Sequence, residues 1–236
     1  MLRAELYKYL KNHLIWITFL VPIAWVFSMI YLVPSLKLVD DANAGLVLYV
    51  VSYNMFSAIV VPTYIILICR IVGEMEERNN NWRLLLCMPV KKYRIYLVKL
   101  FMLMAMLLIL YSGYLTGMLI SGGIFSDFQL PLMKILSDLV ISFLCTFSIL
   151  SFFYIFSLEK ISIIAYLGVG IVILLSGFLV MQSENIWTYF PWCYPTVVPM
   201  ISSFGRIIKF IGINLVITIV IHLMGCIRFC KKEWDI

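Results

Sequence analysis

The sequence predicts an all-α integral membrane protein with six transmembrane helices, and three observations support this fold class. The 236-residue chain is 64% hydrophobic and only 13% charged, which leaves too few charges for the surface of a soluble domain of this size. Six uncharged runs are long enough to cross a membrane as helices, which takes about 20 apolar residues. These runs are continuously apolar, whereas the strands of a membrane β-barrel alternate apolar and polar residues.

The expected segments follow these runs along a single transmembrane domain, 1–236. The first run is longer than the apolar core of a signal peptide, and no small-x-small cleavage site follows it, so we expect it to be retained as a span. The expected order is an interfacial elbow helix at 1–13, spans at 14–36 and 44–73, a cytoplasmic coupling region at 74–92, spans at 93–122, 132–157 and 161–181, an external segment at 182–205, a span at 206–229 and a cytoplasmic tail at 230–236.

The distribution of basic residues predicts the orientation. Six spans place fourteen of the 18 Lys and Arg residues on the side of the two termini and leave only Lys37, Lys134, Arg206 and Lys209 on the other side. Because Lys and Arg concentrate in cytoplasmic loops, we expect both termini in the cytoplasm of a multi-pass plasma-membrane protein. The net charge of +6 then reflects topology and contact with anionic lipid rather than nucleic-acid binding.

Residues 1–13 are amphipathic when wound as a helix. Charged and polar side chains, among them Glu5 and Lys8, fall on one arc. This division predicts a helix lying in the membrane interface; a simple basic flank of the first span is the alternative. The opposite, apolar arc consists of Leu2, Leu6, Tyr9 and Leu10.

Three features inside the spans carry structural predictions. The pattern Gly113-x-x-x-Gly117 allows another helix to approach closely, and Pro22 is tolerated inside a membrane helix if neighbours satisfy the freed carbonyl. Lys134 and Asp138 stand one turn apart at the start of the fourth span. We expect an ion pair that anchors this helix end; a polar contact for a cationic peptide or lipid headgroup is the alternative.

The uncharged stretch 185–205 does not read as a span. Pro191, Pro195 and Pro199 recur every four residues, and no straight helix runs through three such prolines without losing backbone hydrogen bonds. Its aromatic side chains suit the headgroup level of a membrane. We expect an external re-entrant or interfacial helix-turn-helix over 182–205, with an ordinary aromatic loop as the alternative. The aromatic residues are Trp187, Tyr189, Trp192 and Tyr194.

Motifs for catalysis and cofactor binding are missing from the sequence. There is no G-x-x-x-x-G-K-[ST] loop, no H-E-x-x-H and no G-x-S-x-G, and His13 and His222 are isolated. No C-x-x-C pair occurs among the six cysteines, so a zinc site is not expected. We expect a chain that is not an enzyme and that holds no metal or cofactor of its own.

The stretch at 73–100, GEMEERNNNWRLLLCMPVKKYRIYLVKL, interrupts this apolar chain with polar residues. Glu74 and Glu77 continue the second span out of the membrane, and three asparagines then compete for backbone hydrogen bonds and unwind the helix. Residues 82–86 form a short amphipathic helix that ends before Pro89. Its apolar side chains need burial, either on lipid or in a groove of a soluble partner.

This pattern resembles the coupling-helix region of type-2 ATP-binding-cassette (ABC) exporter permeases. The resemblance implies a cytoplasmic ABC ATPase dimer that carries ATP and Mg²⁺, a second, identical or related permease subunit, and an elbow helix at the N-terminus. It also implies that Arg83 and the neighbouring apolar residues dock on the ATPase. The residues that carry the pattern are Glu74, Glu77, Trp82, Leu84, Leu85, Leu86, Pro89, Lys91, Lys92, Tyr96 and Lys99.

In its size and general sequence character, the chain further resembles the permease subunits of lantibiotic self-immunity transporters. That resemblance implies export of a pore-forming, amphipathic peptide from the outer face of a bacterial membrane. The external aromatic residues, with Lys134 and Asp138, would then line the cleft that captures the peptide. Other cargoes stay open, such as drugs, bacitracin-like antibiotics or a lipid-linked glycan, and so does a non-transporting immunity or scaffold protein.

Overall fold

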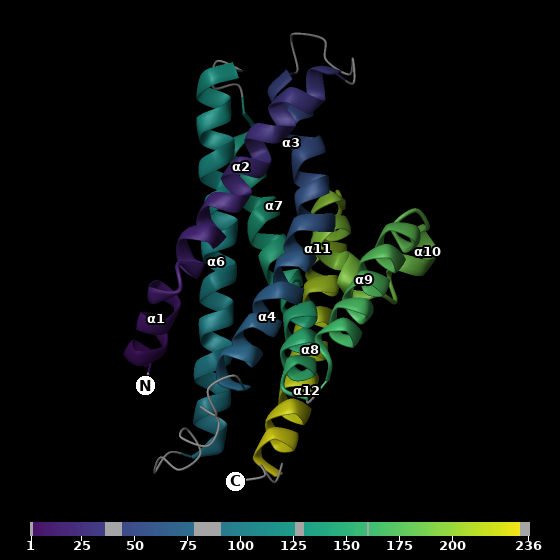
Figure 1. The fold of residues 1–236 in the computed structure, drawn as a ribbon. Coiled ribbons are helices and arrows are strands. Elements are labelled where there is room, and N and C mark those ends of the chain that lie inside the picture. Colours follow the sequence, from purple (N-terminus) through teal and green to yellow (C-terminus); the bar gives the residue numbers. More distant parts are fainter. Residues whose placement is uncertain (1, 36–43, 78–90, 126–129, 160, 232–236) are drawn as a thin grey trace.

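The computed structural model describes residues 2–35, 44–77, 91–125, 130–159 and 161–231, and every regular element in these ranges is helical (Figure 1). The predicted all-helical fold is confirmed, and the described residues contain six candidate membrane spans. Both ends of the chain lie at one end of the helix bundle, called here the terminal end, and the opposite end is the far end (Figure 1). The helices long and apolar enough to cross a membrane cover Leu14–Leu32, Gly45–Met75, Lys92–Gly123, Leu132–Ser157, Ile163–Val180 and Phe204–Lys231.

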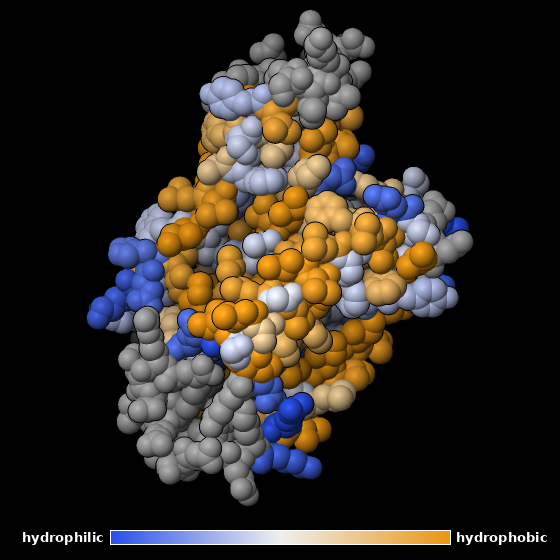
Figure 2. All heavy atoms as spheres, turned by 45° about the vertical axis from the view of Figure 1, so that its right-hand side comes forward, coloured by the Kyte–Doolittle hydropathy of each residue, from blue (hydrophilic) through white to orange (hydrophobic). Residues whose placement is uncertain are grey.

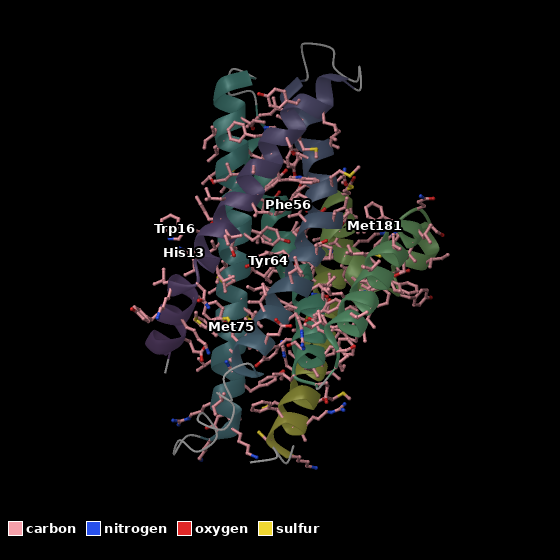
Figure 3. All side chains as sticks on the ribbon, in the orientation of Figure 1. His13, Trp16, Phe56, Tyr64, Met75 and Met181 are labelled. Atoms are coloured by element: carbon pink, nitrogen blue, oxygen red, sulfur yellow. The ribbon has the colours of Figure 1, made fainter. Side chains whose placement is uncertain are left out.

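An abrupt bend at His13 separates the first two helices, α1 (Leu2–Lys11) and α2 (Leu14–Ser35). His13 has a φ of 55°, a left-handed conformation that few residues other than glycine adopt. Its N–H donates to the carbonyl of Leu10 at 3.1 Å, which closes the end of α1. Figure 3 shows His13 at this junction, with Trp16 projecting outward from the start of α2. This junction separates α1, which lies at the terminal end of the bundle, from the first span (Figure 1).

Helix α6 (Lys92–Phe125) packs along α2 through its two small residues. A Cβ atom at Gly113 would lie 2.5 Å from the carbonyl oxygen of Phe19 and 2.7 Å from Cγ of Pro22. A Cβ at Gly117 would lie 3.2 Å from Cα of Ile23. The two backbones therefore approach so closely that Gly113 has no room for a side chain, which confirms the close helix contact predicted from the Gly-x-x-x-Gly pattern.

The second span contains a widened turn just before a proline. It consists of α3 (Ala44–Met55), the π-helical turn η2 (Phe56–Val60) and α4 (Val61–Glu77). The N–H of Val61 donates to the carbonyl of Phe56, five residues back. Pro62 has no N–H to donate, and its ring crowds the carbonyl four residues earlier, so the wider turn relieves both problems. Phe56 is fully buried there and stacks on Tyr114 with ring centroids 4.3 Å apart.

The fourth span is two helices in sequence, α7 (Leu132–Cys145) and α8 (Phe147–Ser157), with Thr146 between them. The hydroxyl of Thr146 donates to the carbonyl of Ser142 at 2.7 Å, a contact that often bends helices. Helix α8 packs between α4 and the last helix. Helix α9 (Ile163–Val180) follows after a short turn, and Ser162 caps its start by accepting a hydrogen bond from the N–H of Ala165.

Between α9 and the last helix, the chain forms four short helical pieces in place of a span. They are α10 (Glu184–Trp187), η3 (Pro191–Cys193), α11 (Tyr194–Val197) and η4 (Val198–Met200), followed by α12 (Phe204–Lys231). Each of the last three pieces carries a proline in its first two positions, where the missing N–H costs nothing. The prediction that the prolines prevent a continuous helix is confirmed.

Helices α9 and α12 leave much of their apolar surface uncovered by the rest of the chain. Ile164 and Leu179 on α9 are 86% and 73% exposed, and Met224 on α12 is 65% exposed. Figure 2 shows apolar side chains over most of the visible face, with hydrophilic side chains gathered at its edges. Such a surface suits contact with lipid chains or with another membrane helix.

Candidate functional site

A buried ion pair ties α1 to α6 at the terminal end of the bundle. Nζ of Lys99 lies 3.5 Å from Oε1 of Glu5, and the two side chains are 1% and 8% exposed. Tyr9, one turn after Glu5, is also buried against the bundle, whereas Leu10 faces outward. Among the described side chains of α1, Glu5 and Tyr9 therefore face inward. The expectation that Glu5 lies on the polar, outward arc is wrong, because a lone carboxylate in the sequence gives no sign of a distant cation such as Lys99.

Of the four apolar residues predicted for the elbow helix, the side chains of Leu2 and Leu6 lie outside the described part of the structure. Tyr9 and Leu10 point in different directions, so they do not share one lipid-facing surface.

The end of α4, which leads into the predicted coupling region, carries a second ion pair. Nε of Arg70 lies 3.2 Å from Oε1 of Glu74, and the guanidinium of Arg70 stands over the ring of Tyr166 on α9, 5.9 Å from its centroid. Glu74 thus reaches back along its own helix. The remaining residues predicted to contact an ATPase lie outside the described residues: the side chain of Glu77, and Trp82, Arg83, Leu84, Leu85, Leu86 and Pro89.

A polar cluster joins α6, α8 and α12 in the terminal half of the bundle. Nδ1 of His222 lies 2.9 Å from the hydroxyl of Tyr96, and its Nε2 lies 2.8 Å from the hydroxyl of Ser151. The hydroxyl of Tyr154 donates to the carbonyl of Tyr96 at 3.0 Å. Both ring nitrogens of His222 are thereby used, which holds α12 against its two neighbours. The isolated histidine in an apolar run was the only sign of this cluster in the sequence.

A second polar cluster lies toward the far end and corrects the prediction for Asp138. The carboxylate of Asp138 is buried and accepts a hydrogen bond from the hydroxyl of Tyr49 at 2.5 Å, while Lys134 is exposed. The hydroxyl of Tyr53 donates to the backbone carbonyl of Pro195 at 3.2 Å. Asp138 therefore braces α7 against α3 and does not form the predicted ion pair with Lys134, since its side chain lies on the inward face of α7.

The four aromatic residues that were expected to line an external cleft differ in burial and do not share one surface. Trp187 and Tyr194 are buried, and both pack against Phe210 of α12, at centroid distances of 4.8 Å and 5.4 Å. Tyr189 is 83% exposed, whereas Trp192 is partly buried and packs toward α9. These four residues could not be told apart in the sequence, because the burial of an aromatic ring depends on how the chain packs and not on the residue type.

Open hollows border α12 in the described part of the chain. A groove of about 870 Å³ runs between α8 and α12, with apolar walls that include Phe152 and Ile221, and with Glu159, Arg228 and Lys231 at its terminal end. Near the far end, a hollow of about 500 Å³ is bordered by Tyr189, Tyr194 and Lys209. The described part of the chain contains no group of three or more His, Cys, Asp or Glu side chains that could hold a metal ion.

This arrangement provides lateral apolar surface for a hydrophobic ligand, and polar clusters that connect the helices. An ion pair between Arg228 and Glu159, 2.9 Å apart, closes the terminal end of the groove. The described residues place no acidic wall along the groove, so a ligand there would be held mainly by apolar contact.

Comparison with known proteins agrees with the resemblance seen in the sequence. The family of ABC-2 family transporter proteins matches residues 1–167 of the chain. No curated protein and no solved structure gives a match. Because the matched region covers well over half of the 236 residues, the chain belongs to the ABC-2 transporter family, as a multi-pass membrane subunit that works with an ABC ATPase.

Proposed function

We propose that this chain is the permease subunit of an exporter that removes a membrane-inserted, amphipathic antimicrobial peptide, as in lantibiotic self-immunity. The groove between α8 and α12 is the observation that carries the proposal. Its walls are apolar along most of its length, and charged groups stand only at the terminal end. An inserted amphipathic peptide presents an apolar face to the membrane interior, and such a face needs apolar surface of this kind.

The same groove bears on the alternative cargoes. A lipid-linked glycan would need hydrogen-bonding groups for its sugars, and the apolar walls of the groove supply few of them. An apolar drug would fit the same walls. A scaffold without transport would have no use for an ATPase partner, which the family provides.

In this proposal the ATPase acts on the segment between α4 and α6. Trp82 and the leucines at 84–86 occupy a groove on the ATPase, with Arg83 contributing a charged contact and Pro89 ending the helix. Glu74 and Glu77 orient the end of α4. When the ATPase dimer closes, the start of α6 moves, and the buried pair between Lys99 and Glu5 makes α1 move with it. A second permease subunit completes the transporter.

The first test is copurification. The tagged chain is extracted gently from its membrane, and the proteins that accompany it are identified by mass spectrometry. We expect an ABC ATPase and a second permease of similar size; an ATPase alone would favour a homodimeric drug or glycan exporter.

A matched pair of variants tests the coupling segment. Trp82→Ala should lose the ATPase or uncouple transport while the chain still inserts. Trp16→Ala is the control, because Trp16 is 60% exposed on the outer surface of α2 (Figure 3). Equal transport by both variants would contradict the docking role of Trp82.

The cargo is tested with the complete transporter in lipid vesicles. A cationic amphipathic peptide should stimulate ATP hydrolysis, and cells expressing the transporter should survive the peptide better than cells whose ATPase is inactive. Protection that persists without ATP hydrolysis would support the non-transporting immunity protein instead.

A further inference from the structure

The groove between α8 and α12 extends along only part of α12. The residues of α12 that line it run from Ile221 to Lys231, the last residue of the helix. At about 1.5 Å per residue, this stretch covers roughly 15 Å. The hydrocarbon core of a membrane is about 30 Å thick, so one leaflet contributes about 15 Å of it. The groove therefore matches one lipid leaflet in length, whereas a complete transmembrane helix would extend well beyond it.

Close contact between α8 and α12 holds the walls of the groove in place. The two helices lie side by side (Figure 1). A Cβ atom at Gly225 would overlap the side chain of Ile155 and would lie 2.9 Å from the hydroxyl oxygen of Tyr96. Larger apolar side chains, such as Phe152 and Met224, also line the groove. Its volume of about 870 Å³ lies within the range of about 300–1,000 Å³ that drug-sized ligands occupy.

Two basic residues, Arg228 and Lys231, line the groove at its terminal end. They stand three residues apart on α12, so they share one face of the helix. Both are exposed, and Nε of Arg228 lies 2.9 Å from Oε1 of Glu159. A guanidinium has five N–H donors, so one carboxylate does not use all of them. The groove lining thus carries two positive charges and one negative charge, all at one end.

The sequence of α12 indicates where this end lies relative to the membrane. From Phe210 to Ile227 the chain has no Asp, Glu, Lys or Arg, and Arg228 is the first charged residue after that run. Charged side chains are costly in the hydrocarbon core and collect at its boundary. We therefore expect Arg228 and Lys231 at the level of the lipid headgroups, with the apolar walls beside the acyl chains of the leaflet on the terminal side.

We propose that the groove binds one anionic phospholipid of this leaflet. Its acyl chain lies along the apolar walls, and its phosphate accepts hydrogen bonds from Arg228 and Lys231. The negative charge of the lipid offsets the excess positive charge of the lining. This site does not rest on the peptide cargo of the proposed function, because the lipid fills the groove when no peptide is bound.

The first test measures which lipid the protein retains. The transporter, with the subunits that copurify with it, is placed in vesicles of equal parts phosphatidylglycerol and phosphatidylcholine, extracted in mild detergent and freed of loose lipid by gel filtration. Mass spectrometry then counts both lipids. We expect phosphatidylglycerol to exceed phosphatidylcholine about fivefold or more, since each basic residue near an anionic surface contributes about a fivefold preference.

Charge variants test the headgroup end of the groove. In the double variant Arg228→Gln with Lys231→Gln, the two lipids should be retained about equally. The matched control is Lys11→Gln with Arg94→Gln, which removes two exposed basic residues at the terminal end of the bundle that do not line the groove. The control should keep the preference of the original protein. An equal loss in both double variants would show a general effect of surface charge and would overturn the proposal.

A variant of opposite sign separates lipid binding from a structural role. Glu159→Gln removes the negative charge of the groove lining and should increase the preference for phosphatidylglycerol. If the ion pair between Glu159 and Arg228 only held the helices together, this variant would retain less lipid or leave the preference unchanged. Either result would contradict the site.

Neighbouring positions on α12 test the apolar walls. Met224 lines the groove and is 65% exposed, whereas Leu223 does not line it and is 59% exposed. Met224→Trp should fill the groove and lower the retained phosphatidylglycerol, and Leu223→Trp should not. Equal retention by the two variants would mean that no acyl chain occupies the groove.

Two outcomes would refute the site as a whole. They are equal retention of both lipids by the original protein, and a preference that survives the loss of Arg228 and Lys231. The groove would then be left for another occupant, such as a helix of the second subunit or the peptide itself. Neither outcome bears on the peptide cargo, since no peptide is present in these measurements.

Discussion

Neutralising Glu5 gives the sharpest test of how the terminal end of the bundle is held together. Glu5→Gln keeps the size and shape of the side chain and removes only its charge. The ammonium of Lys99, which is 1% exposed and lies 3.5 Å from Glu5, would then lose the negative charge of that partner in a buried position. The matched control is Glu159→Gln, because Glu159 forms a shorter ion pair of 2.9 Å with Arg228, whose side chain is 71% exposed.

Burial decides the size of the expected effects. Removing one partner of a buried ion pair costs about 3–5 kcal/mol, whereas an exposed pair contributes about 0–1 kcal/mol. A loss of 1 kcal/mol lowers the unfolding midpoint of a chain of this size by about 2–4 °C. We therefore expect Glu5→Gln to lower the midpoint by about 6–20 °C and Glu159→Gln by less than about 4 °C.

The assay is thermal unfolding of the detergent-solubilised protein, followed by tryptophan fluorescence and by recovery of the folded peak in gel filtration. The double variant Glu5→Gln with Lys99→Met should recover most of the lost stability, because a buried pair replaced by neutral residues of similar size costs little. The reasoning is refuted if Glu5→Gln shifts the midpoint no more than Glu159→Gln does, or if the two single losses simply add in the double variant.

Three further changes test other contacts. Gly113→Val should prevent α6 from packing on α2, because the added Cβ would lie 2.5 Å from the carbonyl oxygen of Phe19. The folded fraction in gel filtration should therefore fall sharply, and an unchanged fraction would refute the close approach of the two helices. His222→Phe leaves the buried hydroxyl of Tyr96 without its partner and should cost about 1–3 kcal/mol in thermal unfolding, while no loss would show that the cluster does not hold α12. Burial raises the pKa of the Cys193 thiol to about 12, so the thiol stays protonated and should resist maleimide at pH 8. The cysteine of a Tyr189→Cys variant should react quickly, because Tyr189 is exposed. Equal labelling of the two positions, measured by mass spectrometry, would contradict the burial of Cys193.

Sequence patterns anticipated the features that depend on neighbouring residues along the chain. Six apolar runs correspond to six helices long enough to span a membrane, and the repeated prolines at 191, 195 and 199 correspond to short helical pieces. The close contact at Gly113 was also predictable, because small residues one turn apart leave a groove on any helix. The identity of the helix that packs against Gly113, α2, was not predictable from the sequence.

The roles of single polar residues were predicted less well. Asp138 was expected to pair with Lys134 one turn away, but it bonds to Tyr49, which is far from it in sequence. Trp187 and Trp192 look equivalent in the sequence, yet one is buried against Phe210 and the other borders a cavity. In each case the deciding neighbour comes from a different helix.

The sequence by itself therefore determined that this protein has six apolar helices long enough to span a membrane, with several helix breaks set by local hydropathy and proline. Membership of the ABC-2 family follows from that same linear pattern over residues 1–167. Only the tertiary structure decided that Glu5 meets Lys99, that His222 joins three helices, and that Ser148 and Trp192 share a cavity. The physical reason is that hydropathy acts on each segment separately, whereas a buried polar group takes whichever partner the packing of distant helices brings to it.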